Sequence, residues 1–397
     1  MKKILIVNNN MHIGGVQKAL VSLLWSIRER CDVTLLLFSP SGECLKDLPA
    51  DVKVITVRSG FRYLGMTRQD VRSGKDKLGR LFYGGVSRLL GRKWAIKLMG
   101  IRQKKLKGYD VAISYLHNGA DKAFYGGCNE FVLNHVDAPR KITFLHCDYG
   151  RCGANTAQNA KQYGCFDRIA ACSQGCADAF IGVNPHLKEK VTVVENCHRY
   201  DTIRASADMA AAELTAGRIN LVTVARLGKE KGVERALEAI AQLGDLREKL
   251  HYHIIGDGIQ RPVLEQIIDR ENLHNTVTLY GMRENPYGFI RQADLLLIPS
   301  YNEAAPLVIG EAACLGTPIL STKTSSAREM IEHKGFGWVC ENSVEGLTNA
   351  LRELLANPQT LAAKAAALKA SQPDNALALA QFFAAIGESN ETKDQTK

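Results

Sequence analysis

Short apolar runs rich in Val, Ile and Leu recur along the chain, and stretches with helical spacing separate them. In one such stretch, 233–243, Val233, Leu237 and Ile240 fall on one helix face. Near-continuous apolar strands alternating with helices are typical of parallel sheets covered by helices on both faces. The sequence therefore predicts an α/β protein with two doubly wound, Rossmann-like domains. The expected strands are 4–9, 33–39, 52–57, 111–116, 142–147, 169–173, 191–195, 221–225, 252–256, 277–281, 295–299, 318–321 and 337–340.

The chain length of 397 residues suits two domains, each with its own core. Polar residues over 196–203 separate the last strand of the first half from a new helix, so we expect domains over 1–198 and 199–373. The alanine-rich segment 374–387 predicts a final helix that packs back on the N-terminal domain. We expect 388–397 to be a polar tail.

Composition narrows the location and the redox state of the protein. No apolar run approaches the roughly 20 residues that cross a bilayer, and no signal peptide follows Met1. We expect a cytoplasmic protein, at most peripheral on the inner face of the cell membrane. The eleven cysteines, an odd number, indicate reduced thiols, with Cys147, Cys172 and Cys340 as small core residues. No Cys-x-x-Cys pair occurs, so no metal site is expected.

Two glutamates bracket the start of a predicted helix that begins near Pro306 and ends near Gly316. Glu311 lies among apolar neighbours on that helix, where a carboxylate is costly unless it is hydrogen-bonded. Glu303 lies at the preceding strand-to-helix turn, where unpaired N–H groups attract an anion. The pattern indicates a ligand with hydroxyls and negative charge. The alternative is a satisfied core carboxylate beside a surface one.

Further candidates follow the ends of other predicted strands. Gly14 and Gly15 precede a helix and allow a phosphate or sugar to approach the backbone, although a Gly-Gly pair is often only a turn. Arg226 and Lys231 end another strand and suit a diphosphate, whereas Lys229 is interpreted as a solvated charge.

Two other strand ends carry glycine or histidine. The sequence Gly256-Asp257-Gly258 lacks the full dinucleotide fingerprint, because Arg261 occupies the place of the third glycine. His146 ends a strand, and a core histidine is the alternative interpretation. No Asp-x-Asp pair occurs, so neutralisation of a diphosphate is expected from Arg226, Lys231 and helix dipoles.

Together these residues resemble the retaining family-four glycosyltransferases (glycosyl transferases group 1) of the GT-B fold, in which two Rossmann-like domains face a central cleft. The resemblance covers nearly the whole chain and is most specific in Glu303-x7-Glu311. It implies that the second domain binds a nucleoside diphosphate sugar, with a UDP-sugar as the expected donor, and that the first binds the acceptor. It also implies retention of anomeric configuration and no cofactor or metal.

The resemblance assigns a role to each matching position. Catalytic residues would be Arg226 and Lys231 at the diphosphate, Glu303 at the donor sugar and His146 beside it. Glu311 would accept hydrogen bonds from the ribose. The other donor-binding positions would be Gly14, Gly15, Gly256, Asp257, Gly258, Met282 and Arg283 near the base, and the backbone of Leu307 and Val308. Ala304-Ala305 departs from the glycine that many relatives have after the first glutamate, which leaves the donor sugar open.

The segment 61–108 carries fourteen Lys or Arg residues against two Asp, a net charge of +12, interleaved with apolar side chains. This mixture predicts docking on an anionic membrane surface; a solvated basic insertion is the alternative. A helical wheel gives one apolar stripe, interrupted by Lys93 and Lys97 and by glycines at 84, 85, 91 and 100. Its members are Val86, Leu90, Trp94 and Ile101. No nucleic-acid module is recognisable.

The sequence thus predicts a glycosyltransferase that moves a sugar to a glycan or lipid-linked acceptor in bacterial-type surface polysaccharide or glycolipid synthesis. Two alternatives stay open: a nucleotide-sugar epimerase or hydrolase on the same fold, and a non-catalytic nucleotide-sugar-binding protein.

Overall fold

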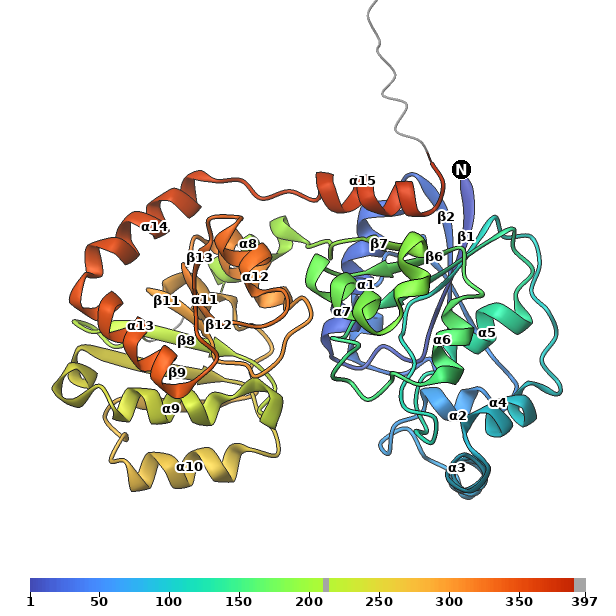
Figure 1. Cartoon of the computed structure of the whole chain (residues 1–397), viewed down its shortest axis with the longest axis horizontal. Coiled ribbons are helices and arrows are strands. Elements are labelled where there is room, and N and C mark those ends of the chain that lie inside the picture. Colours follow the sequence, from blue (N-terminus) through green and yellow to red (C-terminus); the bar gives the residue numbers. More distant parts are fainter. Residues whose placement is uncertain (210–213, 389–397) are drawn as a thin grey trace, which may run out of the picture. The chain divides into compact units, whose positions relative to one another are not determined.

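The computed structural model describes residues 1–209 and 214–388 and divides the chain into two compact units (Figure 1). The first unit is Met1–Cys197 together with the chain from Asn375 onward, and the second is His198–Asp374. The sequence places the corresponding boundaries at 198/199 and 373/374. Beyond Glu388, the predicted polar tail lies outside the described residues.

The first unit contains a seven-stranded parallel sheet in the order β3-β2-β1-β4-β5-β6-β7. Its strands are β1 (Lys2–Asn8), β2 (Cys31–Leu37), β3 (Lys53–Thr56), β4 (Val111–Ser114), β5 (Arg140–Leu145), β6 (Arg168–Ala171) and β7 (Val191–Val193). Its helices are α1 (Gly15–Ile27), α2 (Arg62–Gly65), α3 (Gly74–Leu90), α4 (Arg92–Gly100), α5 (Cys128–His135), α6 (Ala157–Tyr163), α7 (Gln174–Val183) and α15 (Ala376–Ala385).

The second unit contains a six-stranded parallel sheet in the order β10-β9-β8-β11-β12-β13. Its strands are β8 (Ile219–Val224), β9 (Leu250–Ile255), β10 (Val277–Gly281), β11 (Leu295–Ile298), β12 (Ile319–Thr322) and β13 (Gly337–Cys340). Its helices are α8 (Tyr200–Met209), α9 (Val233–Ala241), α10 (Arg261–Arg270), α11 (Tyr287–Gln292), α12 (Leu307–Leu315), α13 (Val344–Ala356) and α14 (Pro358–Ala370), with a short 3₁₀ turn, η3 (Lys229–Lys231).

Both sheets have the doubly wound arrangement that the alternating pattern predicts. Each expected strand overlaps an observed one, and no end differs by more than two residues. Alternate residues of β1 enter separate cores: Ile4 and Ile6 belong to one, and Leu5 and Val7 to the other. The sheet is therefore buried on both faces, which explains why its strands are apolar throughout.

The strand order reverses beside the first strand of each sheet, between β1 and β4 and between β8 and β11. At such a switch point the two neighbouring loops diverge and leave a crevice outside the carboxyl ends of the strands. The topology therefore directs the search for a site to the loops that follow these four strands.

The C-terminal helix α15 belongs to the first unit. Phe382 and Phe383 lie in the same core cluster as Leu24 and Ile27 of α1. At its end, Lys2 Nζ donates to Gly387 O (2.9 Å) and Arg140 Nε donates to Ala385 O (2.9 Å). These two cations stabilise the helix where its carbonyls lack intrahelical partners.

The basic segment contains the short helix α2 and the longer helices α3 and α4, and Gly91, with a φ of +87°, separates α3 from α4. The predicted interruption at Gly91 is confirmed, so the residues of the helical-wheel stripe do not lie on one continuous helix. Gly84 and Gly85 lie inside α3 rather than interrupting it, and Gly100 is the last residue of α4.

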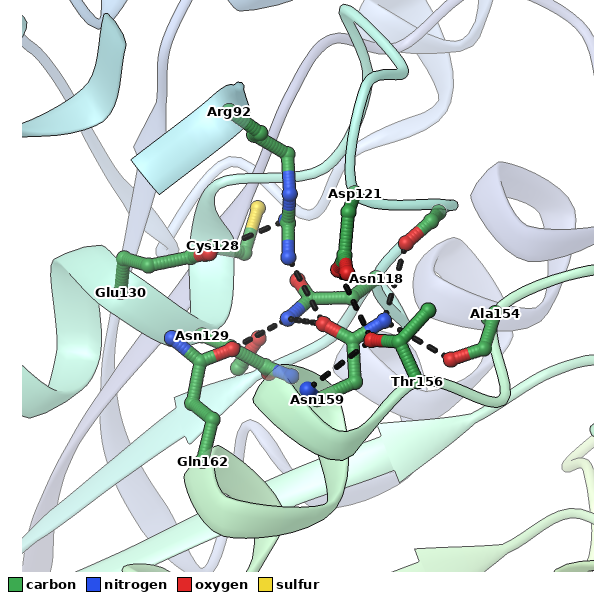
Figure 2. Close-up of polar contacts among 12 residues, drawn as sticks. Arg92, Asn118, Asp121, Cys128, Asn129, Glu130, Ala154, Thr156, Asn159 and Gln162 are labelled. Atoms are coloured by element: carbon green, nitrogen blue, oxygen red, sulfur yellow. Dashed lines mark hydrogen bonds and ion pairs between the residues drawn. The ribbon is translucent and has the colours of Figure 1, made fainter. Parts of the chain in front are cut away.

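Arg92, at the start of α4, is not a surface charge. Its side chain is 1% exposed and its Nη1 lies 3.0 Å from Glu130 Oε1 of α5 (Figure 2). Its Nη2 donates to Asn159 Oδ1 of α6 (2.8 Å), and Asn118 Nδ2 donates to the same oxygen (3.2 Å). A buried ion pair and an amide network thus hold α4 of the basic segment against the rest of the first unit.

Among the residues described, no helix combines the length and apolar composition needed to cross a bilayer.

Candidate functional site

The switch point of the second sheet brings together two residues that the sequence singles out separately. Lys231, in the loop after β8, places its Nζ 2.7 Å from Oε1 of Glu303, in the loop after β11. Ser300 Oγ donates to the same carboxylate oxygen (2.7 Å). The Glu303 side chain is only 11% exposed. A largely buried, hydrogen-bonded ion pair therefore lies where an α/β sheet ordinarily binds its ligand.

Close packing of the two backbones holds these loops together. Gly232 has a φ of +60°, and a Cβ there would lie 2.2 Å from Pro299 O. The Tyr301 N–H donates to Glu230 O (3.0 Å), which joins the loops directly. Only glycine fits position 232, so the sequence Lys231-Gly232 has a structural cause.

The loop of Glu303 is also held from its other side. Ser325 Oγ donates to Glu303 O (2.9 Å), and Thr322 Oγ1 donates to Ser300 O (2.6 Å). The guanidinium of Arg235 lies over the Tyr301 ring at 3.7 Å. Sequence reasoning missed these supporting residues, because single hydroxyls and one helical arginine carry no recognisable spacing.

Arg226 occupies the same loop as Lys231 but is placed differently. It is 79% exposed and pairs with Glu230 at 2.9 Å. Lys229 is also exposed, in agreement with its interpretation as a solvated charge. Within this loop Lys231 is the cation held beside Glu303.

The glycines after β9 allow the β8 and β9 loops to touch. Gly256 has a φ of +135°, and a Cβ there would lie 1.8 Å from Ala225 O. A Cβ on Gly258 would lie 2.4 Å from Leu227 O, and the Leu227 N–H donates to Asp257 O (2.9 Å). The packing of the chain itself accounts for both glycines, and their contact with a donor stays a prediction.

Asp257, Met282 and Arg283 complete the predicted set at this edge of the sheet. Asp257 Oδ1 accepts from the Gly258 N–H (2.7 Å), which steadies the turn. Met282 and Arg283 are exposed directly after β10. Since the strands are parallel, these residues lie at the same edge of the sheet as Lys231 and Glu303.

Helix α12 carries Glu311 into an apolar core. Pro306 caps the helix, which begins at Leu307, and Gly316 ends it with a φ of +79°. Glu311 is buried, and Tyr287 OH of α11 donates to its Oε1 at 3.3 Å. The structure thus contains the buried, hydrogen-bonded carboxylate that the sequence predicts at position 311.

The N-terminus of α12 has features that suit an anion. Its first turn contains no acidic residue, and no side chain caps it. The Leu307 and Val308 N–H groups are among those that lack intrahelical partners at a helix start. Further along, a Cβ on Gly310 would lie 2.4 Å from His198 Nε2. His198 was not among the residues predicted from the sequence. Burial lowers its pKa to about 4, so it is neutral at pH 7.

The first unit carries the remaining predicted residues at its own strand ends. Gly14 caps α1 in an extended conformation, φ −171°, and the helix begins at Gly15. A Cβ on Gly15 would meet nothing within 4 Å. The packing of the chain itself therefore does not require glycine at position 15.

His146 follows β5, with its ring 4.7 Å from that of Tyr115. Burial and the nearby His117 lower the pKa of His146 to about 3, although a hydrogen bond with the Tyr115 backbone acts to raise it. His117 follows β4, was missed by the sequence, and has its pKa lowered to about 4 by burial. His146 Nε2 and His117 Nδ1 are buried, and neither has a hydrogen-bonding partner in the described part of the chain. Two neutral imidazoles at adjacent strand ends can exchange hydrogen bonds with hydroxyls.

The described residues contain no group of three or more His, Cys, Asp or Glu side chains arranged to hold a metal ion.

Comparisons with known proteins give a family match over the second unit and fold matches over nearly the whole chain. Residues 207–370, which carry the Lys231–Glu303 pair and Glu311, match the family described as glycosyl transferases group 1. The amylovoran biosynthesis glycosyltransferase AmsK of Erwinia amylovora is 32% identical over 145 residues, 34% of this chain. The aligned segment spans 35% of the length of AmsK, about a third of that relative.

Solved structures match over nearly the whole chain. HepE of Anabaena, solved in complex with UDP, has a TM-score of 0.65 at 19% identity and covers 96% of both chains. WaaG, a glycosyltransferase involved in lipopolysaccharide biosynthesis, has a TM-score of 0.58 at 18% identity, covering 97% of this chain and all of that one. These neighbours have the GT-B fold, and so does this chain. The match to the glycosyl transferases group 1 family, residues 207–370, lies within the second unit.

Proposed function

We propose that the protein is a retaining, metal-independent glycosyltransferase that moves a sugar from a nucleoside diphosphate sugar, with a UDP-sugar as the expected donor, to a glycan or lipid-linked acceptor. The observation that carries the proposal is the Lys231–Glu303 pair at the switch point of the family domain. The names of AmsK and WaaG support a place in surface polysaccharide or glycolipid synthesis.

Departure of a nucleoside diphosphate is the step that this site suits. Negative charge develops on the leaving phosphate, and fixed positive groups stabilise such a transition state. In the proposed arrangement Lys231, Arg226 and the N–H groups of Leu307 and Val308 supply that charge. No metal or other cofactor is required in this scheme.

The carboxylates and histidines would bind hydroxyls. Glu311 would accept from the ribose, with Tyr287 keeping one of its oxygens in place. Glu303 would contact the donor sugar, oriented by Lys231 and Ser300. The resemblance assigns His146 to the same sugar and Gly14-Gly15 to the phosphates. The neutral imidazole of His146 suits a hydrogen bond rather than charge stabilisation.

The proposal is tested by incubating the protein with uridine, guanosine and adenosine diphosphate sugars, with and without lipid-linked acceptors, and following products by mass spectrometry. Transfer requires the acceptor, whereas epimerisation or hydrolysis does not, and a binding protein gives no product. Chelation with EDTA should leave the rate unchanged. The anomeric configuration of the product, read by NMR, tests retention.

Variants separate donor binding from turnover. Glu311→Ala should weaken donor binding, whereas Lys231→Ala and Arg226→Ala should chiefly lower kcat. Lys229→Ala is the matched control, because it removes an exposed charge from the same loop. Unchanged donor affinity in the Glu311 variant, or an equal loss of kcat in the Lys229 variant, would contradict the assignment.

We further propose that the first unit docks on an anionic membrane surface through α3. Leu78, Leu81, Phe82 and Leu89 are 57–81% exposed; the last three follow Leu78 by three, four and eleven residues, so all four share one helix face. The stripe lies in the segment of net charge +12, and it is flanked by the exposed cations Lys75, Lys77 and Arg88. Apolar insertion combined with basic charge is typical of helices that lie in a bilayer interface.

Liposome sedimentation at low salt tests this docking. We expect retention by vesicles that contain anionic phospholipid and release as salt rises. Replacing both Leu81 and Phe82 by Ser should reduce retention, while Ile259→Ser, which changes an even more exposed apolar residue in the second unit, should not. Equal retention by neutral vesicles would contradict an electrostatic contribution to binding. Full retention of the double variant would contradict a role for α3.

A further inference from the structure

Two cysteine thiols face each other in the loop after β5. Cys147 Sγ and Cys152 Sγ are 3.2 Å apart. The interpretation of Cys147 as a core residue inside a strand is wrong, since β5 ends at Leu145 and Cys147 is only half-buried. Cys152 is exposed. A disulfide has its sulfurs about 2.05 Å apart, so this pair needs to close by only roughly 1 Å.

The loop itself holds the two sulfurs in place. The Cys152 N–H donates to Asp148 O (3.0 Å), which closes a turn between the cysteines. Tyr149 and Ala154 are fully buried, and Tyr149 OH donates to Ala154 O (2.7 Å). The short sulfur separation therefore comes from an anchored turn rather than from two freely rotating side chains.

The two thiols differ in reactivity. The Cys147 thiol donates to Cys152 Sγ. This hydrogen bond and those from backbone N–H groups outweigh the effect of burial and lower the pKa of Cys152 to about 7. The same bond and burial raise the pKa of Cys147 well above its ordinary value. Because the thiolate is the nucleophile, exposed Cys152 reacts first and Cys147 follows.

We propose that Cys152 and Cys147 form a reversible modification site for low-molecular-weight disulfides. The Cys152 thiolate attacks one sulfur of a disulfide such as oxidised glutathione, the S–S bond breaks, and one glutathione leaves as thiolate. Cys147 then loses its proton to water and attacks the Cys152 sulfur, and the second glutathione leaves as thiolate. Both cysteine sulfurs are oxidised, both glutathione sulfurs are reduced, and a thiol reductant reverses the two steps.

A second thiol pair provides an internal comparison. Cys172 Sγ and Cys176 Sγ are 3.7 Å apart, and the Cys176 thiol donates to Cys147 O (3.3 Å). Both are buried, so neither offers the exposed thiolate that the first step needs. The bond is therefore expected between Cys147 and Cys152. It forms directly after His146, in the loop that carries this predicted site residue.

Peptide mapping of the intact protein tests the site. Trypsin cuts after Arg151, so Cys147 and Cys152 fall in separate peptides, 142–151 and 152–161. The reduced protein is incubated with oxidised glutathione, its free thiols are alkylated, and the digest is analysed by mass spectrometry. We expect the two peptides to be joined, with the loss of two hydrogen atoms, and to separate after treatment with a reductant.

Variants then test the order of the steps. Cys147→Ser should keep glutathione on Cys152, whereas Cys152→Ser should leave Cys147 unmodified. Cys165→Ser, which removes another exposed thiol, should leave the joined peptides unchanged. The proposal is overturned if the wild-type peptides stay separate, if Cys147 is joined to the peptide of Cys172 and Cys176 instead, or if Cys147 takes up glutathione without Cys152. The wild-type result alone decides the site, so a poorly folding variant does not remove the test.

Discussion

Replacing Arg92 by Met should destabilise the first unit by about 3–5 kcal/mol, because it leaves a buried carboxylate without its counter-ion. The side chains of Arg92 and Glu130 are 1% and 8% exposed, and their charged atoms are 3.0 Å apart. At an effective dielectric constant of about 20, their attraction is about 5 kcal/mol. Met keeps most of the buried volume, so the loss comes from the charge left on Glu130 and from the hydrogen bond to Asn159.

A second substitution should rescue the first. In Arg92→Met combined with Glu130→Gln no buried charge is left unpaired, so the double variant should be more stable than Arg92→Met alone by about 1–3 kcal/mol. Arg88→Met is the matched control, since Arg88 lies exposed near the end of α3. Its effect should stay within about 0.5 kcal/mol.

Urea unfolding followed by tryptophan fluorescence measures these differences, provided that the signal comes from one unit. The chain has three tryptophans, and a Trp338→Phe background leaves Trp25 and Trp94, both in the first unit. If Arg92→Met costs no more than Arg88→Met, the pair does not fasten the segment. Additive costs in the double variant would show that the two charges do not interact.

Three further outcomes are expected. Gly256→Ala should cost at least about 1 kcal/mol more than Gly244→Ala in urea unfolding, because both glycines have positive φ but only at 256 would a Cβ overlap a carbonyl, at 1.8 Å; equal costs would contradict the role of close packing. Tyr287→Phe removes the donor to Glu311 and should weaken donor binding about 2–10-fold by calorimetry; an unchanged Kd would speak against Glu311 as a ligand. Burial lowers the pKa of His253 to about 4. As the pH falls, this histidine is therefore protonated in the unfolded chain at a higher pH than in the folded one. Stability should be full above about pH 6.5 and fall towards pH 4, by about 2 kcal/mol at pH 5 from this group alone; the same urea midpoint at pH 8 and pH 5 would refute this.

The strands could be predicted because their signal is local. A parallel strand buried on both faces must be apolar at every position, as in Leu295–Ile298, where all four residues are buried. The order of strands in each sheet has no such signal, because it depends on which surfaces pack after the strands form. The sequence indicated two doubly wound domains, and only the structure locates the switch points beside β1 and β8.

The basic segment shows where sequence reasoning stops. A helical wheel cannot tell which face of a helix is covered: Val86 packs against the core, whereas Leu89 is exposed. Arg92 looks like one of many surface charges, because its partner Glu130 lies 38 residues away in the sequence. Such partners are chosen by tertiary packing, so the buried ion pair and the exposed stripe of α3 both needed coordinates.

The structure shows which glycines near the predicted site are required by packing and which are not. Gly232 and Gly256 have positive φ, and a side chain on either would strike a carbonyl oxygen of a neighbouring loop. Any chain with these loop contacts needs glycine there, whether or not it binds a ligand. At Gly15 the space is open, and α1 carries no acidic residue in its first turn. A helix start left bare by the packing of the protein itself is the kind of surface that a phosphate can approach. Gly15 is therefore stronger evidence for a bound anion than the Gly256-Asp257-Gly258 sequence, although the sequence alone ranks them equally.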